Sequence, residues 1–301
     1  MNIYAKILKD SICGTNRLTT FEVQLPKVLL AELNTHRILS KNFQSSRALP
    51  NKAAVEVESF EPLFFGKNQS GMQAKDEEIY EVEKAKEIWN SHIEASKAAS
   101  INLAALKLHK QWTNRPNDWH TMAKGVISGT EWKNFRWLRN HSDAQPEFHE
   151  LASQINFCLN MSEPQVLNPG EYHLPYVWTE RDSNGRLTYR DFTDTEIDID
   201  TAIKLSVSCC AQVSYRQMNE TLEKAISIYD KLNINSPSPN ARCHVSPLEH
   251  VGTPIDLGGI YFDPITWEEG VTHIRRDGSV WSGNFQGWIQ YRQLIPNNTV
   301  W

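Results

Sequence analysis

The sequence lacks several features that would assign it to a membrane or to the secretory pathway. No apolar run approaches the roughly 20 residues that a helix needs to cross a bilayer. The opening MNIYAKILKD shows no signal-peptide core followed by a small-residue cleavage site. The five cysteines are odd in number and include no C-x-x-C pair, so we expect reduced thiols and no metal site. Together these absences predict a cytoplasmic protein.

The chain also lacks an excess of positive charge. The formal net charge is −5 and the pI is near 6.1, and no basic stripe is present to bind a polyanion. A nucleic-acid partner is therefore not expected, whereas a small nucleotide needs only two or three placed cations. Tryptophan, in contrast, is abundant with 10 residues, most of which we interpret as core and interface anchors. A chain of 301 residues is long enough to bury a substantial core.

Hydrophobic patterning predicts a mixed α/β fold. Residues 2–9 and 17–25 alternate between apolar and polar side chains, which predicts two strands joined by a turn at 11–16. A short amphipathic helix opens at Pro26, because proline costs little at a first helical position. Its apolar stripe consists of Val28, Leu29 and Leu33.

Helical spacing dominates the middle of the chain. Residues 76–110 predict one long helix, or two with a break, and a further helix begins at Pro146. The apolar face of this second helix consists of Phe148, Leu151, Ile155 and Leu159. Later helices are expected from caps at Asp200 and Asn219. Irregular spans separate these helices, with a polar turn at 182–185.

The stretch from Thr35 to Arg47 is polar where the preceding segment is apolar. Its serines, amides and two arginines suit a loop that binds an anion, and Arg37 and Arg47 each offer a planar fork for phosphate or carboxylate. The simpler alternative is a helix C-terminus, with His36 and Arg37 complementing the helix dipole. Composition alone favours this alternative.

The order of residues in this stretch resembles the signature loop of the flavin-dependent thymidylate synthases. The matching positions are His36, Arg37, Ser40, Asn42, Ser45 and Arg47. Two positions depart from the family pattern: Thr35 replaces its first Arg, and Phe43 stands where the family has Glu.

A second stretch resembles another signature of the same family. Asn134 and Arg139 match in register on an expected helix, whereas Asp143 replaces the family's His. Upstream, Lys110 falls near a family Arg that holds the substrate phosphate, with Arg115 as a competitor. The alternative for Arg139 is a surface pair with Asp143 one helical turn later, worth only a few tenths of a kcal/mol.

A third signature lies near the C-terminus, where His244, Ser246, Glu249 and His250 match the family pattern. In local terms Ser246 is expected to cap a helix that begins with proline, with Glu249 closing a capping box. Ser214 belongs to a segment that precedes this signature in the family. Here both segments follow the His-Arg loop, which predicts a circular permutation.

The resemblance implies a single permuted domain over 1–301, α/β (α+β) in class. Its central sheet is expected to be mostly antiparallel and flanked by long helices. The core blocks are 1–50, 76–162 and 200–250; the insertions are 51–75 and 163–199; the C-terminal extension is 251–301, with no assigned role.

The resemblance also implies an activity: reductive methylation of dUMP at C5 to dTMP, with FAD, NADPH and 5,10-methylenetetrahydrofolate and without a cysteine nucleophile. The family assembles its site from several subunits of a tetramer, so a homo-oligomer is expected. Substrate-binding positions are Glu32, Ser45, Ser46, Arg47, Lys110 and Arg139. Cofactor-binding positions are His36, Arg37, Ile38, Asn42, Asn134, Ser214, His244, Ser246 and Glu249.

Three alternatives stay open. Glu32 aligns with a family Gln near the pyrimidine, and an acceptor-only carboxylate suits the amino group of cytosine. The substrate could then be another pyrimidine nucleotide such as dCMP, methylated or hydroxymethylated. The departures at Thr35, Phe43 and Asp143 could instead mark a non-catalytic protein that binds flavin or nucleotide. The third alternative is a purely structural α/β assembly protein.

Overall fold

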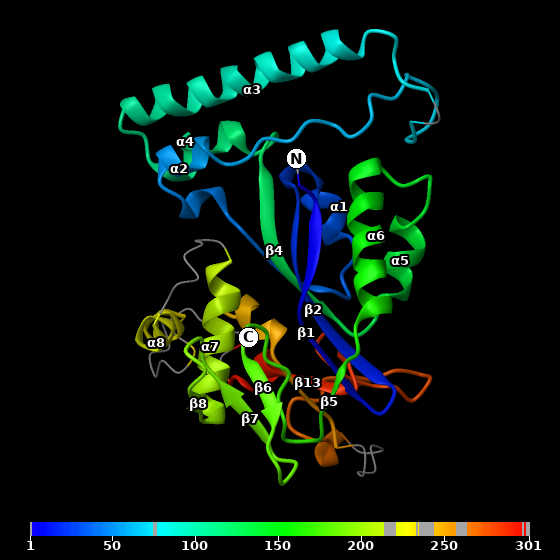
Figure 1. The fold of residues 1–301 in the computed structure, drawn as a ribbon, viewed down its shortest axis with the longest axis vertical. Helices are drawn as coiled ribbons and strands as arrows, with labels where there is room; N and C mark the ends of the chain where they lie inside the picture. The colour runs from blue at the N-terminus through cyan, green and yellow to red at the C-terminus, as the bar shows by residue number, and fades with distance from the viewer. Residues whose placement is uncertain are drawn as a thin grey trace.

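The structure is a computed structural model that describes residues 2–74, 77–213, 221–232, 234, 244–256, 264–296 and 298. A five-stranded sheet in the order β3-β4-β2-β1-β5 runs through its centre (Figure 1). The strands are β1 Tyr4–Cys13, β2 Asn16–Pro26, β3 Ser40–Phe43, β4 Met122–Gly129 and β5 Gln165–Val166. Neighbours in the sheet are antiparallel except β1 and β5. This confirms the predicted mostly antiparallel sheet.

The hairpin of β1 and β2 is longer than predicted. Pairing continues through Ser11↔Leu18 to Cys13↔Asn16, so the predicted six-residue turn at 11–16 was wrong. Gly14, with φ +57°, allows the chain to reverse within two residues. The fully buried residues of β2 include Phe21, Val23 and Leu25.

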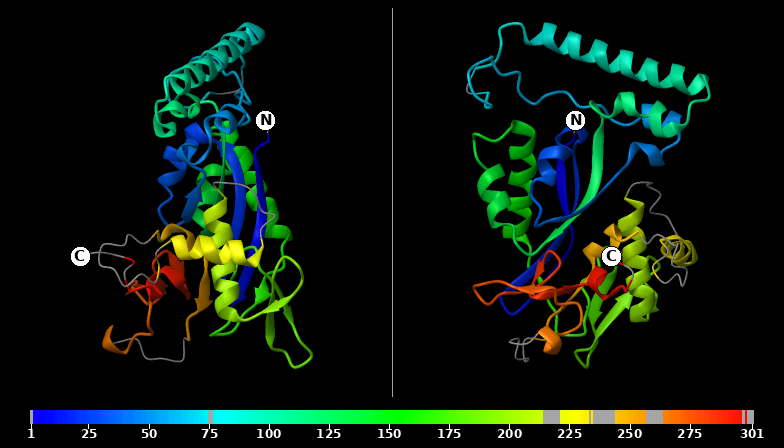
Figure 2. Two further views of the ribbon diagram at one scale, coloured as in Figure 1. Left: turned by 90° about the vertical axis from the view of Figure 1, so that its left-hand side faces the viewer. Right: turned by 180° about the vertical axis from the view of Figure 1, so that it is seen from behind.

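Two helices, α5 Lys133–Arg139 and α6 Pro146–Met161, lie beside the hairpin (Figures 1 and 2). The helix predicted from Pro146 is confirmed. Its four predicted apolar residues are all buried and belong to the same hydrophobic cluster as the inner residues of β2. Burial of this face holds α6 on the sheet, since apolar area removed from water contributes roughly 25 cal/mol per Å².

The segment after β2 differs from its prediction. A 3-10 turn, η1 Lys27–Leu29, precedes the five-residue helix α1 Leu30–Asn34. Leu29 and Leu33 are buried as predicted, but Val28 is 49% exposed and does not join the stripe. The expected polar loop also contains a strand, because residues of β3 pair with β4 from Ser40↔Ser128 to Phe43↔Gly125.

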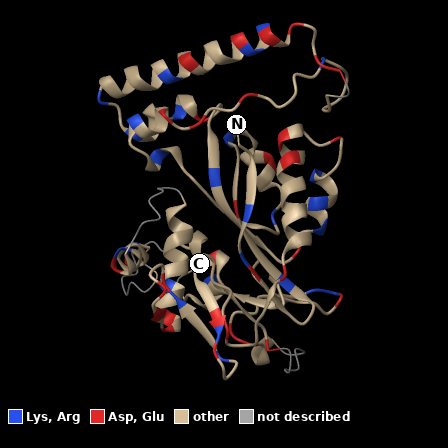
Figure 3. Cartoon of the chain, in the orientation of Figure 1, with Lys and Arg blue, Asp and Glu red and all other residues tan. Residues whose placement is uncertain are grey.

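The region between β3 and β4 forms an arm above the sheet (Figure 1). Its elements are η2 Ser46–Ala48, α2 Asn51–Val55, α3 Val82–Ala105, α4 Lys110–Thr113 and η3 Arg115–Asn117. The break allowed for in the long predicted helix falls at Lys107, whose φ is 61°. Figure 3 shows acidic and basic residues interspersed along α3. Ion pairs within this helix include Glu83–Lys86 and Glu94–Lys97.

The second half of the chain packs beneath the hairpin end of the sheet. Its elements are β6 Trp178–Arg181, β7 Leu187–Arg190, β8 Glu196–Ile197, α7 Ile199–Gln212, α8 Leu222–Lys231, η4 Ser246–His250, β9 Gly252–Pro254, η5 Pro264–Thr266, β10 His273–Ile274, β11 Val280–Ser282, β12 Phe285–Gln286, β13 Trp288–Gln290 and η6 Tyr291–Leu294. The buried side chains of Phe285 and Trp288 share one cluster with Leu18 of β2 and Leu248 of η4. The described part of the C-terminal extension is therefore built into the core.

Three predicted caps are corrected. Asp198, not Asp200, caps α7 by accepting a hydrogen bond from the Thr201 amide. Thr221 caps α8, and Asn219 lies outside the described residues. Ser246 begins a 3-10 helix and makes no capping hydrogen bond, so the predicted capping box was wrong.

Within the described ranges, none of the helices combines the length and apolar character that crossing a membrane requires. Nor do the described His, Cys, Asp and Glu side chains form a group of three or more that could hold a metal ion.

Candidate functional site

Three of the predicted cofactor-binding residues line one cavity of about 570 Å³. They are Asn42 of β3, His244 and Ser246. The other described lining residues are Ala211, Gln212, Lys224, Ile228, Lys231, Leu232 and Pro247. We call this space, between β3, α7, α8 and η4, the α8 cavity. The amide of Asn42 donates to the carbonyl oxygen of Cys210 at 2.7 Å, which ties β3 to α7 at the cavity wall.

The first and third signatures meet here because η4 packs against β3 and β4. His250 of η4 is 0% exposed, and its Nδ1 lies 2.9 Å from Ser128 Oγ of β4. Burial lowers the pKa of His250 to about 3, so the ring is neutral and serves as an anchor. Ser214 lies outside the described residues.

Two lysines at this cavity were missed at the level of sequence. Lys224 and Lys231 are exposed residues of α8, seven positions apart and therefore on the same side of the helix. The signal was present, because the buried residues Ala225 and Tyr229 define the opposite face. Two cations and an imidazole around a cavity with apolar walls can hold a ligand that carries anionic groups.

A second group of predicted residues meets at the C-terminal end of α5. The Nε of Arg139 donates to the Nε2 of His36 at 2.9 Å, and its guanidinium lies 4.6 Å from the centre of the Phe148 ring. The ring of His36 also makes an edge contact with Phe135 at 5.0 Å between centroids. A surface pair with Asp143 therefore does not account for the placement of Arg139.

His36 is held in its neutral form. It is 7% exposed, and burial, followed by the charges of Arg139 and Lys41, lowers its pKa to about 4. Since Nε2 accepts a hydrogen bond from Arg139, the ring proton resides on Nδ1.

Arg139 and Glu32 line the same groove, which has a volume of about 660 Å³. We call it the α5 groove. Its other lining residues are Met72, Gln73, Trp137, Leu138, His141, Asp143, Ala144, Gln145 and Phe148. The indole of Trp137 is largely exposed, so the groove offers a cation, a carboxylate and an aromatic face together. Two predicted substrate residues are thus brought together.

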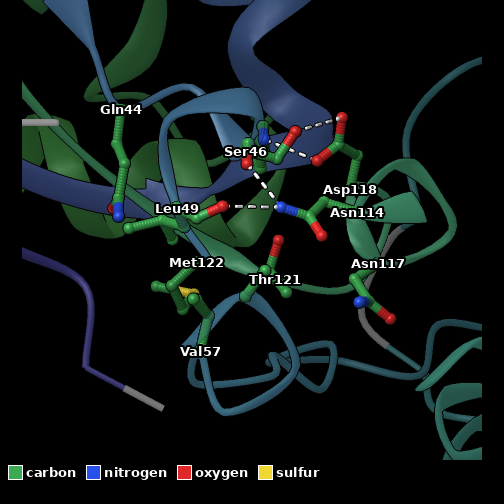
Figure 4. A pocket seen from close by; sticks show the side chains of 11 residues that line it. Gln44, Ser46, Leu49, Val57, Asn114, Asn117, Asp118, Thr121 and Met122 are labelled. Carbon is green, nitrogen blue, oxygen red and sulfur yellow. Dashed lines mark hydrogen bonds and ion pairs between the residues drawn. The ribbon is translucent and has the colours of Figure 1, made fainter. Parts of the chain in front are cut away.

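A third group lies on the other flank of the sheet, where η2 meets α4 and η3. Ser46 is buried, and its Oγ donates to the Asp118 carboxylate at 3.3 Å, while Asn114 donates to its carbonyl oxygen at 2.8 Å (Figure 4). The pocket beside them has a volume of about 20 Å³, which is room for about one water molecule. Lys110 reaches the carbonyl oxygen of Ala48 at 3.1 Å. Ser46 and Lys110 thus already form hydrogen bonds with other groups of the protein.

Among the described residues, the α5 groove is lined by Arg139 and not by Arg47. The pocket beside Ser46 and the α5 groove share no described lining residue. Figures 1 and 2 draw α4 and α5 on opposite sides of β4.

The remaining predicted residues differ in exposure. Arg37, Arg47 and Asn134 are exposed and Ser45 is half-buried, whereas Ile38 packs against the core cluster around Phe21.

Glu249 has a partner that the sequence did not predict. Its carboxylate forms an ion pair with Arg292 of η6. Beside it, the Nε2 of Gln290 donates to Ser40 Oγ at 2.9 Å and to the carbonyl oxygen of Glu249 at 3.1 Å. The C-terminal extension therefore joins the first signature to the third. No local pattern announces this, because each contact spans tens to hundreds of residues.

The family resemblance is tested by comparison with known proteins. Residues 17–165, just under half of the chain, match the family model described as thymidylate synthase complementing protein. The first two signature stretches, which carry Arg47 and Arg139, lie within this match, and the resemblance noted there is confirmed.

Among solved structures, the UMP/dUMP methylase PolB from Streptomyces cacaoi bound with 5-Br dUMP is similar at 13% identity. The match covers 52% of this chain and 90% of that one, with a TM-score of 0.45. The flavin-dependent thymidylate synthase ThyX from Helicobacter pylori, complexed with FAD and dUMP, is similar at 23% identity. That match covers 46% of this chain and 66% of that one, with a TM-score of 0.33. No curated protein matches.

Proposed function

We propose that the protein is a flavin-dependent methyltransferase that converts dUMP to dTMP with methylenetetrahydrofolate and NADPH. One observation carries the proposal: Asn42, His244 and Ser246, from two signatures some two hundred residues apart, line one cavity beside the segment that matches the family. The packing of η4 on β3 and β4 supports a circular permutation as well, because the reordered segments still meet.

The residues of the α8 cavity fit FAD. A volume of about 570 Å³ lies in the range of cofactor sites, and Ala211, Ile228 and Leu232 supply apolar wall. Lys224 and Lys231 face the same space and suit an anionic diphosphate. When bound, the flavin supplies the hydride chemistry. The chain itself binds and orients it, with Asn42 held in place by Cys210.

The α5 groove fits the nucleotide. Arg139 presents a guanidinium to a phosphate, and Glu32 and Trp137 line the same groove and suit a base. Ser46 and Arg47 belong to η2, directly after Ser45, and Lys110 begins α4, which Figure 1 draws on the other side of β4 from α5. We therefore propose that a second copy of the chain supplies these residues, so that the active unit is a homo-oligomer.

A product assay tests the proposal. Purified protein is incubated with FAD, NADPH and methylenetetrahydrofolate, with dUMP and dCMP in parallel reactions, and the nucleotides are separated. Formation of dTMP from dUMP is the expected result. Protein that binds flavin but yields no product from either nucleotide would instead indicate a non-catalytic binding protein.

A second substrate is favoured by one specific observation. The carboxylate of Glu32 lines the groove with Arg139, and a carboxylate only accepts hydrogen bonds, which suits the exocyclic amino group of cytosine. Conversion of dCMP in preference to dUMP would support this alternative. A Glu32→Gln variant should then shift the preference toward dUMP.

A further inference from the structure

His36 lies beside Arg139 and not among the described lining residues of the α8 cavity. The signature resemblance assigns it to the flavin. The cavity wall instead includes Asn42, which lies six residues later in the chain, within β3. The nearest recorded partner of the His36 ring is the Arg139 guanidinium, at 2.9 Å.

Arg139 is fixed from two directions. Its Nε donates a hydrogen bond to His36, and its guanidinium carbon lies over the Phe148 ring. Among the described residues, no acceptor is recorded for its two Nη groups, and the residue lines the α5 groove. An arginine fork held in this way has lost most of its rotamer freedom before a ligand arrives, which raises affinity by lowering the entropic cost of binding.

His36 can perform this role only as a neutral acceptor. An imidazolium has no lone pair to offer and would repel the guanidinium. The surroundings favour the neutral ring, because burial and the charges of Arg139 and Lys41 all lower its pKa.

We propose that His36 is a positioning residue that orients the Arg139 fork toward the phosphate of a nucleotide in the α5 groove. This inference rests on the proposed function. It places His36 on the nucleotide side of the protein, whereas the signature resemblance places it on the flavin side. The two assignments predict opposite results for the same variant.

The test compares two substitutions that fill the same space. His36→Leu removes the acceptor, and His36→Gln keeps a carbonyl oxygen that can accept from Nε. The affinity for dUMP is measured by calorimetry on FAD-loaded protein, the affinity for FAD by fluorescence quenching, and the melting temperature is recorded for each. His149→Ala, which changes an exposed histidine of α6, is the matched control.

We expect His36→Leu to weaken dUMP binding about tenfold, with FAD affinity unchanged, and His36→Gln to restore most of the loss. Equal dUMP affinity in His36→Leu and wild type overturns the inference and leaves the proposed function standing. Loss of FAD affinity in His36→Leu also overturns it, in favour of the flavin assignment. Failure of His36→Gln to rescue, at an unchanged melting temperature, does the same. A wild-type protein that binds neither dUMP nor inorganic phosphate overturns both proposals.

Discussion

Acidification from about pH 7 to about pH 5 should destabilise the protein, because four described histidines are buried as neutral rings: His36, His120, His173 and His250. His250 Nδ1 lies 2.9 Å from Ser128 Oγ, which lies 2.6 Å from Thr20 Oγ1, which lies 2.8 Å from His173 Nε2. His173 Nδ1 lies 2.9 Å from Ser11 Oγ. Both rings are 0% exposed, so neither can gain a proton in the folded state without losing solvation.

The direction and the size of the change in unfolding free energy follow from the linkage between proton binding and folding. Burial lowers the pKa of His250 to about 3, and burial together with the charge of Lys9 lowers that of His173 well below its usual value. In the unfolded chain each histidine titrates near 6.5, so below that pH the unfolded state binds protons that the native state does not. The stabilisation is complete above about pH 6.5 and is lost as pH falls toward the folded pKa. Between pH 7 and pH 5, each ring should lower the free energy of unfolding by roughly 2 kcal/mol.

Urea unfolding at several pH values between about 5 and 7 measures this loss. His250→Asn keeps an amide near the position of Nδ1 and removes the titration of this ring, so it should abolish about a quarter of the effect of the four buried histidines. His149→Asn, at an exposed position of α6, is the control and should leave the slope unchanged. A His250→Asn protein with the wild-type dependence of unfolding free energy on pH would refute the reasoning.

Three further substitutions should change the stability or the ligand affinity of the protein. Gln290→Leu should lower the free energy of unfolding by about 1–3 kcal/mol, because Ser40 Oγ loses a buried donor; an unchanged urea midpoint would contradict this. Lys231→Gln should weaken FAD binding several-fold and reduce its salt dependence, whereas Lys133→Gln on α5 should change neither in a fluorescence titration. Arg47→Ala should weaken dUMP binding roughly tenfold to a hundredfold while FAD binding is retained, and Arg47→Lys should restore only part of the affinity. A parallel loss of FAD binding would show that the role assigned to Arg47 is wrong.

Local patterns predicted the elements whose stability is local. The predicted helix from Pro146 is confirmed, because its apolar residues repeat with helical spacing and proline fixes its start. The two strands of the β1–β2 hairpin are confirmed, but the predicted strands end before the tip, where Gly14 allows a tighter turn. The structure confirms the predicted sheet and the helices that flank it.

Features that depend on distant partners were missed. β3 is a strand because the edge of β4 pairs with it, although its own sequence is typical of a loop. Glu249 makes an ion pair with Arg292 in place of capping its own helix. Gln290 contacts Ser40 across 250 residues of sequence. No window of sequence contains both partners of such a contact.

The candidate site divides in the same way. Signature motifs identified Asn42, His244 and Ser246, which meet in one cavity. They did not identify Lys231, nor that His36 and Arg139 face each other. Motif matching names residues, whereas the partner of each residue is set by the packing of whole elements.

Binding of FAD to the α8 cavity is the central claim, and a fluorescence titration of FAD into wild-type and His244→Ala protein tests it most directly. We predict saturable FAD binding by the wild type and at least tenfold weaker binding by His244→Ala, with the melting temperature unchanged because His244 is exposed. A wild-type protein that does not bind FAD, or a His244→Ala variant that binds it with unchanged affinity, would contradict the assignment of this cavity to the flavin.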